Sequence, residues 1–208
     1  MILITYNILK KIPEMFREHK PFKRSVIGFS FMVASQASLA YYALYSVRIY
    51  HAGSAEIALF TAITALANIV SSVVFGILSD RIGHRIMLVL SSVCGGLAGV
   101  LILVIPGLWT VYAAFALTNF CMNGYNLSSG ILVIEQIPRA RLPMGISINT
   151  MITLIVSSLL TIGSSFLIDQ FSFLYVFVIA GLSGFAGAII LYSGSKAPAK
   201  VSEAGRTL

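Results

Sequence analysis

Charged side chains are scarce in this sequence. Only 10% of its 208 residues are Asp, Glu, Lys or Arg, whereas 58% are hydrophobic, and the mean hydropathy is +0.93. A soluble domain carries about a quarter charged residues. The scarcity of charge therefore excludes an ordinary soluble domain and predicts an integral membrane protein surrounded by a lipid bilayer.

Cysteine and catalytic motifs are scarce as well. Cys94 and Cys121 both fall within apolar segments, where a thiol behaves as a small hydrophobic side chain, so we expect them to be packing residues. The chain has no HExxH, no paired intramembrane aspartates and no GxSxG; Ser128 and Ser129 lie in NLSSG. We therefore expect no enzymatic activity, no cofactor and no metal site.

Long apolar runs are what the sequence does contain. A bilayer core about 30 Å thick requires about 20 apolar residues in a helix. By that measure the fold class is an all-α membrane protein with six transmembrane helices, and the expected spans are Val26–Val47, Ala55–Ser79, Ile86–Ile105, Trp109–Ile134, Met144–Ile168 and Phe173–Tyr192. The very short connections near residues 105–108 and 169–172 predict antiparallel neighbours in a bundle.

The basic residues lie almost entirely on one side of these spans. Thirteen of the fourteen Lys and Arg fall before the first span, in the second and fourth gaps, or after the last span, and Arg48 is the exception. The positive-inside rule then places both termini in the cytoplasm, N-in and C-in, as expected for a multi-pass protein of the cell (inner) membrane. The membrane topology thus accounts for the net charge of +7, and we expect no nucleic-acid partner.

The chain divides into three parts. Residues 1–25 form a basic cytoplasmic segment, in which Ile8, Ile12, Met15 and Phe16 recur at helical spacing. Either a short helix on the membrane surface or a basic tether would fit this segment. The six-helix bundle spans residues 26–193, and the small, polar residues 194–208 are expected to be a disordered cytoplasmic tail.

Polar residues inside the spans are candidates for a substrate cavity. Asn119, Asn123 and Asn126 in the fourth span recur at i, i+4 and i+7, which places them on one stripe. A cavity lining and interhelical hydrogen bonding both explain them, and we favour the lining because one helix contact rarely needs three amides. For the isolated Asn68 and Asn149 we favour hydrogen bonding between helices.

The first span adds three further cavity candidates. Tyr41 and Tyr45 share one helical face, along which amphipathic side chains can meet water, and Gln36 lies on another face. No Asp, Glu, Lys or Arg lies near the middle of any span, so the chain supplies no obvious proton-coupling carboxylate. The amides and tyrosines suit a neutral, hydroxylated or amphipathic small-molecule substrate.

The gap between the second and third spans carries a dense motif, GILSDRIGHR, at residues 76–85. Gly76 would let the helix end approach a neighbour, Asp80 would cap the turn, and Gly83 would allow a positive φ. The pattern G-x-L-x-D-R-x-G-x-R in a cytoplasmic loop resembles the signature of the major facilitator superfamily. The resemblance implies a transporter that works by alternating access.

The same resemblance implies that this chain is one half of such a transporter. Members typically have twelve spans in two six-helix halves, and this chain has six. ILKKIPEMFREHKPFKR, residues 8–24, resembles the linker that leads into the second half, and IEQIPRARLPMG, residues 134–145, resembles the loop between the tenth and eleventh helices. The chain therefore resembles the C-terminal half, from about residue 9 to 193. This resemblance implies a second six-helix half or a homodimer as partner.

Charged residues of these two loops could form a conformational latch. The expected members are Gly76, Asp80, Arg81, Gly83, Arg85, Glu135, Arg139 and Arg141. Exposed ion pairs contribute only about 0 to 1 kcal/mol each, but a bistable bundle needs only a few kcal/mol of bias. The alternative is that the arginines only fix topology. We favour the latch, because orientation requires neither an aspartate nor glycines.

Two functions follow from these patterns. The first is transmembrane transport of a small solute by a half-size or truncated transporter. The alternative is a non-transporting membrane protein, either a truncated gene product or a scaffold for regulation or assembly. Because six helices leave one wall of the expected cavity missing, the sequence is compatible with both functions.

Overall fold

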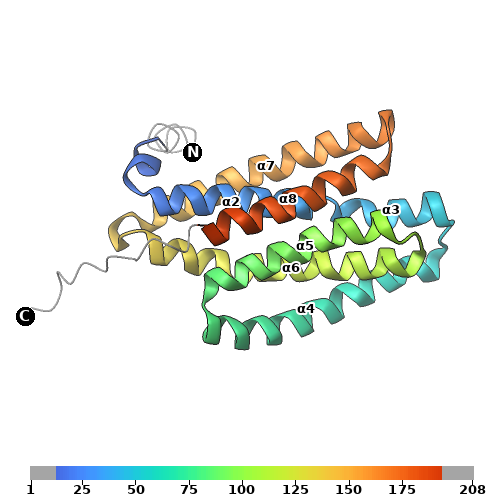
Figure 1. The fold of residues 1–208 in the computed structure, drawn as a ribbon, viewed down its shortest axis with the longest axis horizontal. Coiled ribbons are helices and arrows are strands. Elements are labelled where there is room, and N and C mark those ends of the chain that lie inside the picture. The colour runs from blue at the N-terminus through green and yellow to red at the C-terminus, as the bar shows by residue number, and fades with distance from the viewer. Residues whose placement is uncertain (1–12, 194–208) are drawn as a thin grey trace, which may run out of the picture.

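The computed structural model describes residues 13–193, and within that range every element is helical. From Lys20 to Ser193, seven α-helices and one short 3₁₀ helix follow one another, joined by short connections (Figure 1). Their bounds are α2 Lys20–Gln36, α3 Leu39–Tyr50, α4 Ser54–Ile82, α5 His84–Val104, α6 Leu108–Gln136, η1 Arg139–Arg141, α7 Leu142–Gln170 and α8 Phe173–Ser193.

Within residues 13–193, five helical segments are long and apolar enough to cross a membrane, and α2 with α3 counts as one of them. The chain is therefore a multi-pass integral membrane protein. The five are Lys20–Tyr50, Ser54–Ile82, His84–Val104, Arg139–Gln170 and Phe173–Ser193. α6 is as long as α4, but its three asparagines lower its hydropathy, so its span stays a prediction.

The first span differs most from the expected helix. It begins at Lys20, six residues earlier than predicted, with Pro21 in its first turn and Phe22 fully buried. It is also broken at Ala37 and Ser38, between α2 and α3. The Ser38 hydroxyl donates to the Ser35 carbonyl at 2.9 Å, which satisfies one of the carbonyls that the break leaves without an amide partner.

The termini of the chain are only partly described. Residues 13–18 are helical, and Met15 is buried against the bundle, as in the first of the two alternatives for this segment, a short helix. Ile8, Ile12 and the lysines at 10 and 11 lie outside the described residues, as does the predicted tail 194–208.

The helices pack in a repeated pattern that the sequence did not reveal. α4 packs on α6 as α7 packs on α2, and α5 packs on α6 as α8 packs on α2. α5 and α8 face each other. The helices α2 to α5 and the helices α6 to α8 therefore form two units with similar packing, as in membrane proteins built from three-helix repeats.

α4 and α7 lie at opposite edges of the bundle (Figure 1). In the most apolar 18-residue stretch of each segment, only 17% of α4 and 11% of α7 is buried, compared with 50% of α5 and 50% of α8. Their apolar side chains face outward, including Leu66 and Ile69 on α4 and Leu159 and Ile162 on α7, each at least 63% exposed. These two helices therefore border lipid or a further protein.

The centre of the bundle is a backbone contact between α5 and α8. A methyl group added at Gly99 would lie 2.6 Å from the Cα of Gly181, and one added at Gly184 would lie 2.3 Å from the backbone nitrogen of Gly96. Helices without Cβ atoms at the crossing approach closely and gain van der Waals contact that a larger residue would prevent. Gly99 and Gly184 are thus helix-packing residues.

Gly184→Ala is expected to destabilise the bundle, because the new methyl group meets backbone atoms of α5 that cannot move independently. Overpacking of this kind costs about 1 to 3 kcal/mol, which would lower the midpoint of thermal unfolding in detergent by several degrees. Gly163→Ala on α7 is the control, since its methyl group would meet nothing within 4 Å. Equal stability of the two variants would contradict the backbone contact.

Candidate functional site

Two neighbouring hollows share the side chain of Phe115 on α6. The helix-break hollow, about 440 Å³, is lined by Val33, Gln36, Ala37, Leu39, Ala40, Phe115, Met122, Ser157 and Thr161. The α4–α6 hollow, about 480 Å³, is lined by Phe60, Thr61, Thr64, Ala65, Asn68 and Phe115. They lie on either side of Phe115, one against α7 and the other against α4.

The break in the first span forms one wall of the helix-break hollow. Gln36, Ala37 and Leu39, which flank the break, line it together with Ala40. Irregular backbone at membrane depth occurs where it is buried in protein or lines a cavity. Broken helices in transporters place their helix ends at substrate or ions for this reason.

Gln36 and Tyr41 are held at this hollow by hydrogen bonds to other helices. The Gln36 amide donates to Cys121 Sγ on α6 at 3.8 Å. The Tyr41 hydroxyl donates to the Thr161 carbonyl on α7 at 2.7 Å and lies 2.8 Å from Ser165 Oγ. Both predicted residues therefore stand beside the hollow, Gln36 in its lining and Tyr41 next to Thr161.

Tyr45 lies elsewhere. Its ring packs edge-on against Tyr50, Phe173 and Phe177, with centroids 5.2 to 5.8 Å apart, in an aromatic cluster between α3 and α8. Tyr45 lines neither hollow. The i, i+4 spacing correctly places it on the face of Tyr41, but the bundle covers that end of the face with α8.

The three asparagines of α6 have three different surroundings. Asn119 is 3% exposed and donates to the Phe115 carbonyl of its own helix at 2.9 Å. Asn123 is half-buried and donates to α4, to Asn68 Oδ1 at 2.6 Å and to Ser71 Oγ at 2.7 Å. Asn126 is exposed. The structure does not join the three in one hollow, although Asn123 reaches the α4–α6 hollow through Asn68.

Asn68 and Asn149 also have distinct positions. Asn68 lines the α4–α6 hollow and accepts the hydrogen bond from Asn123, so it links two helices as well. Asn149 on α7 is 7% exposed, and within the described part of the chain its Oδ1 has no hydrogen-bond partner.

The lining of both hollows is uncharged. Aromatic and aliphatic groups alternate with hydroxyl and amide groups, and neither lining contains Asp, Glu, Lys or Arg. Among the described residues, no three His, Cys, Asp or Glu side chains lie close enough together to hold a metal ion. Such surfaces bind neutral solutes through a few hydrogen bonds and apolar contact.

The family model of the Major Facilitator Superfamily matches residues 25–207, which is most of the chain. This chain belongs to the Major Facilitator Superfamily. Comparison with curated proteins finds no match, and neither does comparison with solved structures. The family gives the chain a transporter-type role and agrees with the expectation that it is not an enzyme.

The GILSDRIGHR motif at residues 76–85 forms a tight reversal between α4 and α5. Gly83 has φ 86°, the positive φ that was predicted for this glycine. It is both the C-cap residue of α4 and the N-cap residue of α5. Gly76 is different: a methyl group there would meet nothing within 4 Å, so no close neighbour requires a glycine at that position. The expectation that Gly76 lets the helix end approach a neighbour is therefore wrong in this conformation.

The predicted latch is not assembled in this conformation of the superfamily protein. The side chains of Asp80, Arg81, Glu135 and Arg139 are exposed, and no ion pair joins them within residues 13–193. Arg85 instead donates from Nε to the Leu191 carbonyl of α8 at 2.9 Å. The latch residues lie at the ends of separate helices, and their side chains reach other partners.

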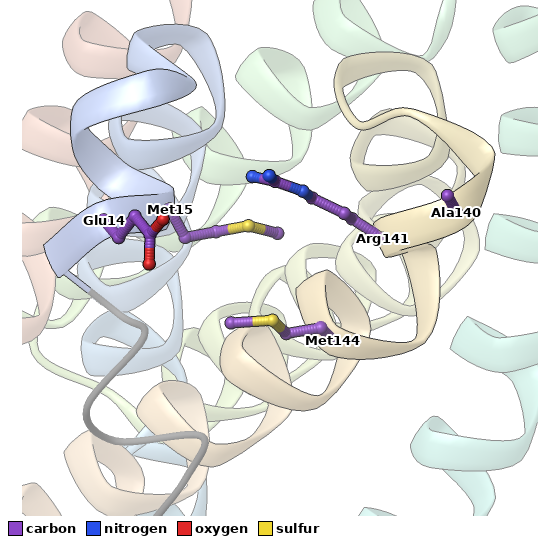
Figure 2. Close-up of a pocket in the computed structure, with 5 residues that line it drawn as sticks. All are labelled: Glu14, Met15, Ala140, Arg141 and Met144. Atoms are coloured by element: carbon purple, nitrogen blue, oxygen red, sulfur yellow. The ribbon is translucent and has the colours of Figure 1, made fainter.

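Arg141 pairs with a residue that the sequence patterns did not suggest. Its guanidinium forms an ion pair with Glu18, from the segment that precedes α2. Figure 2 shows Arg141 extending into a hollow of about 290 Å³, which Met15 and Met144 also line, together with Glu14 and Ala140. The ion pair therefore joins the N-terminal segment to the start of α7.

Other residues of the hollows escaped the sequence patterns. Thr61 and Thr64 lie at i and i+3 on α4, and Ser157 and Thr161 lie at i and i+4 on α7, so each pair shares a helical face. All four side chains carry hydroxyl groups, whereas the residues that the sequence predicted for the cavity are amides and tyrosines. Hydroxyl pairs at helical spacing within apolar spans were the signal that would have found them.

The link between Asn123 and Asn68 predicts a measurable coupling. In a double-mutant cycle with Asn123→Ala and Asn68→Ala, the coupling free energy of unfolding is expected to be about 0.6 to 1.7 kcal/mol, the range of hydrogen bonds between membrane helices. Asn126→Ala, at the exposed position, replaces Asn123→Ala in the control cycle and should show no coupling. Additive effects in both cycles would argue against the hydrogen bond.

Proposed function

We propose that this chain moves a small neutral solute across the membrane by alternating access, as one six-helix half of a transporter. The observation that carries the proposal is the pair of uncharged hollows around Phe115, with a broken helix as one wall. Family membership supports it. α6 is the sixth span in this proposal, and both termini lie in the cytoplasm, as the distribution of Lys and Arg favours.

The chemistry of the hollows favours a hydroxylated or amphipathic solute. Hydroxyl and amide groups exchange hydrogen bonds with a neutral polar substrate, and Phe115 and Phe60 offer apolar faces. A charged substrate would have no counter-ion in either lining. Coupling to a proton or another ion would then depend on groups outside these two hollows.

A second six-helix unit completes the cavity in this proposal. The hollows are open, and α4 and α7 expose apolar side chains on both edges of the bundle. A second copy of the chain, or a different six-helix half, would close the cavity and rock against this half. The alternative function is a non-transporting membrane protein, for which the hollows would be lipid-filled surface.

Cysteine labelling separates a water-filled cavity from a lipid-facing surface. Thr64→Cys and Ser157→Cys, in a chain with Cys94 and Cys121 replaced by Ala, are expected to react with a membrane-impermeant maleimide, because a thiol ionises readily only near water. Alternating access predicts labelling from both sides of sealed vesicles. Leu182→Cys on α8, 67% exposed, is the lipid-facing control and should stay unlabelled.

Two results would count against the proposal. Labelling from one side alone, or none at all, favours the non-transporting alternative. A bifunctional maleimide tests the homodimer on the same Ser157→Cys variant, since facing hollows would give a crosslinked pair of chains. A monomer on the gel, with labelling from both sides, would point to a different six-helix half.

Asp80 is proposed to bias the two conformations of the transporter, pairing in the conformation that this structure does not show. Asp80→Asn is then expected to change the ratio of labelling from the two sides by up to about five-fold, because one exposed ion pair contributes about 0 to 1 kcal/mol. Asp169→Asn, also exposed but at the other end of the bundle, is the matched control. An unchanged ratio with Asp80→Asn would remove Asp80 from the latch.

A further inference from the structure

Two arginines from different helices converge on the C-terminal end of α8. Arg85 on α5 donates from Nε to the Leu191 carbonyl at 2.9 Å, and Arg24 on α2 donates from Nη1 to the Ser193 carbonyl at 3.3 Å. The two acceptors are two residues apart in the last turn of α8. Both guanidinium groups therefore lie beside one helix end, at the end of the bundle where α2 and α5 begin (Figure 1).

The positive charge at this point is not balanced by the protein that the structure describes. A helix C-terminus carries about half of a negative charge, against two full positive charges on Arg24 and Arg85. Within residues 13–193 the ion pair between Arg141 and Glu18 is the only one, and it involves neither arginine. An excess of about 1.5 positive charges therefore remains at the end of α8.

Each arginine also keeps free donors. Arg85 uses Nε for the carbonyl of α8, which leaves the two terminal nitrogens of its guanidinium for another acceptor. Arg24 uses one of its terminal nitrogens. Guanidinium groups bind phosphate oxygens in a two-pronged geometry, so a pair of them suits one phosphate. Capping α8 needs donors, but it does not need two cations.

An apolar surface continues from these arginines along the bundle. Ile27 and Phe31 follow Arg24 at i+3 and i+7 on the same face of α2, and each is 39% exposed. On the neighbouring α8, Ile189 and Tyr192 are 68% and 67% exposed. A phosphate held by the arginines would thus have its hydrocarbon chain beside exposed apolar side chains, as a phospholipid requires.

We propose that Arg24 and Arg85 hold the phosphodiester group of an anionic phospholipid at the end of α8. An acyl chain of the lipid lies along the exposed residues of α2 and α8. The residues of this site line neither hollow, so the lipid site does not depend on the proposed transport function. Bound lipid ties α2, α5 and α8 together at one end of the bundle.

Native mass spectrometry of the full chain in detergent tests this site. Phosphatidylglycerol is expected to bind more tightly than phosphatidylcholine to the wild-type chain. Arg24→Gln and Arg85→Gln each keep a hydrogen-bond donor for α8 but remove the charge, and each should weaken phosphatidylglycerol binding about five-fold. Arg17→Gln is the control: Arg17 is exposed, is not among the donors to α8, and carries the same charge. Its binding should not change.

The outcomes separate the possible ligands. Equal binding of the two lipids, or equal binding by wild type and Arg24→Gln, would overturn the proposal. Displacement of phosphatidylglycerol by millimolar inorganic phosphate would assign the site to a soluble phosphate compound and overturn the lipid. If Arg85→Gln does not fold, Arg24→Gln still decides, because its hydrogen bond is exposed and long, and Arg85→Lys tests whether charge without the two-pronged geometry is enough.

Discussion

The contact between the backbones of α5 and α8 is the constraint on which the rest of the bundle depends. A methyl group at Gly99 on α5 would lie 2.6 Å from the backbone of Gly181 on α8, and one at Gly184 on α8 would lie 2.3 Å from the backbone of Gly96 on α5, so neither position has room for one. In lipid there is no hydrophobic force between helices, so close van der Waals packing must hold them together. α6 and α2 then pack on the outer sides of this pair, and α4 and α7 are left at the edges.

This arrangement decides where the hollows lie. α6 and the broken first span pack against the rigid pair on one side, and their other sides face α4 and α7. Because α4 and α7 are loosely packed, the spaces beside Phe115 are not filled. In the proposed rocking of one half against another, the packed centre would keep its shape while α4 and α7 slide against the second half.

The spans and the reversing loop could be predicted from the sequence, because both depend on local properties. Length and hydropathy placed the ends of the long helices within about three residues, except for the start of the first one, and Gly83 takes the positive φ that the loop requires. The break at Ala37 and Ser38 could not be predicted. No Pro or Gly marks it, and it is held by the hydroxyl of Ser38, which bonds Ser35 and lies 3.2 Å from the Tyr42 hydroxyl.

The candidate site was only partly predictable, for a similar reason. Helical spacing shows which residues share a face of a helix. It does not show which neighbouring helix covers each position along that face. Asn119 is buried against its own helix, Asn123 bonds α4, and Asn126 is exposed, although all three lie on one stripe. The partner of Arg141 is likewise set by the path of the chain, which brings Glu18 back to α7 from 123 residues away.

The uncharged groups that line the hollows and the charged groups at the helix ends lie at different positions along the bundle. The two hollows contain no ionisable carboxylate or basic group, whereas Arg24, Arg85 and Arg141 all act at helix ends. Neutral groups within the membrane avoid the cost of burying charge, and charges at the ends interact in a screened environment where each contributes little. Affinity for a solute and preference for one conformation would then be adjusted by different residues, so that a change at a helix end shifts the balance of conformations without altering what the hollows bind.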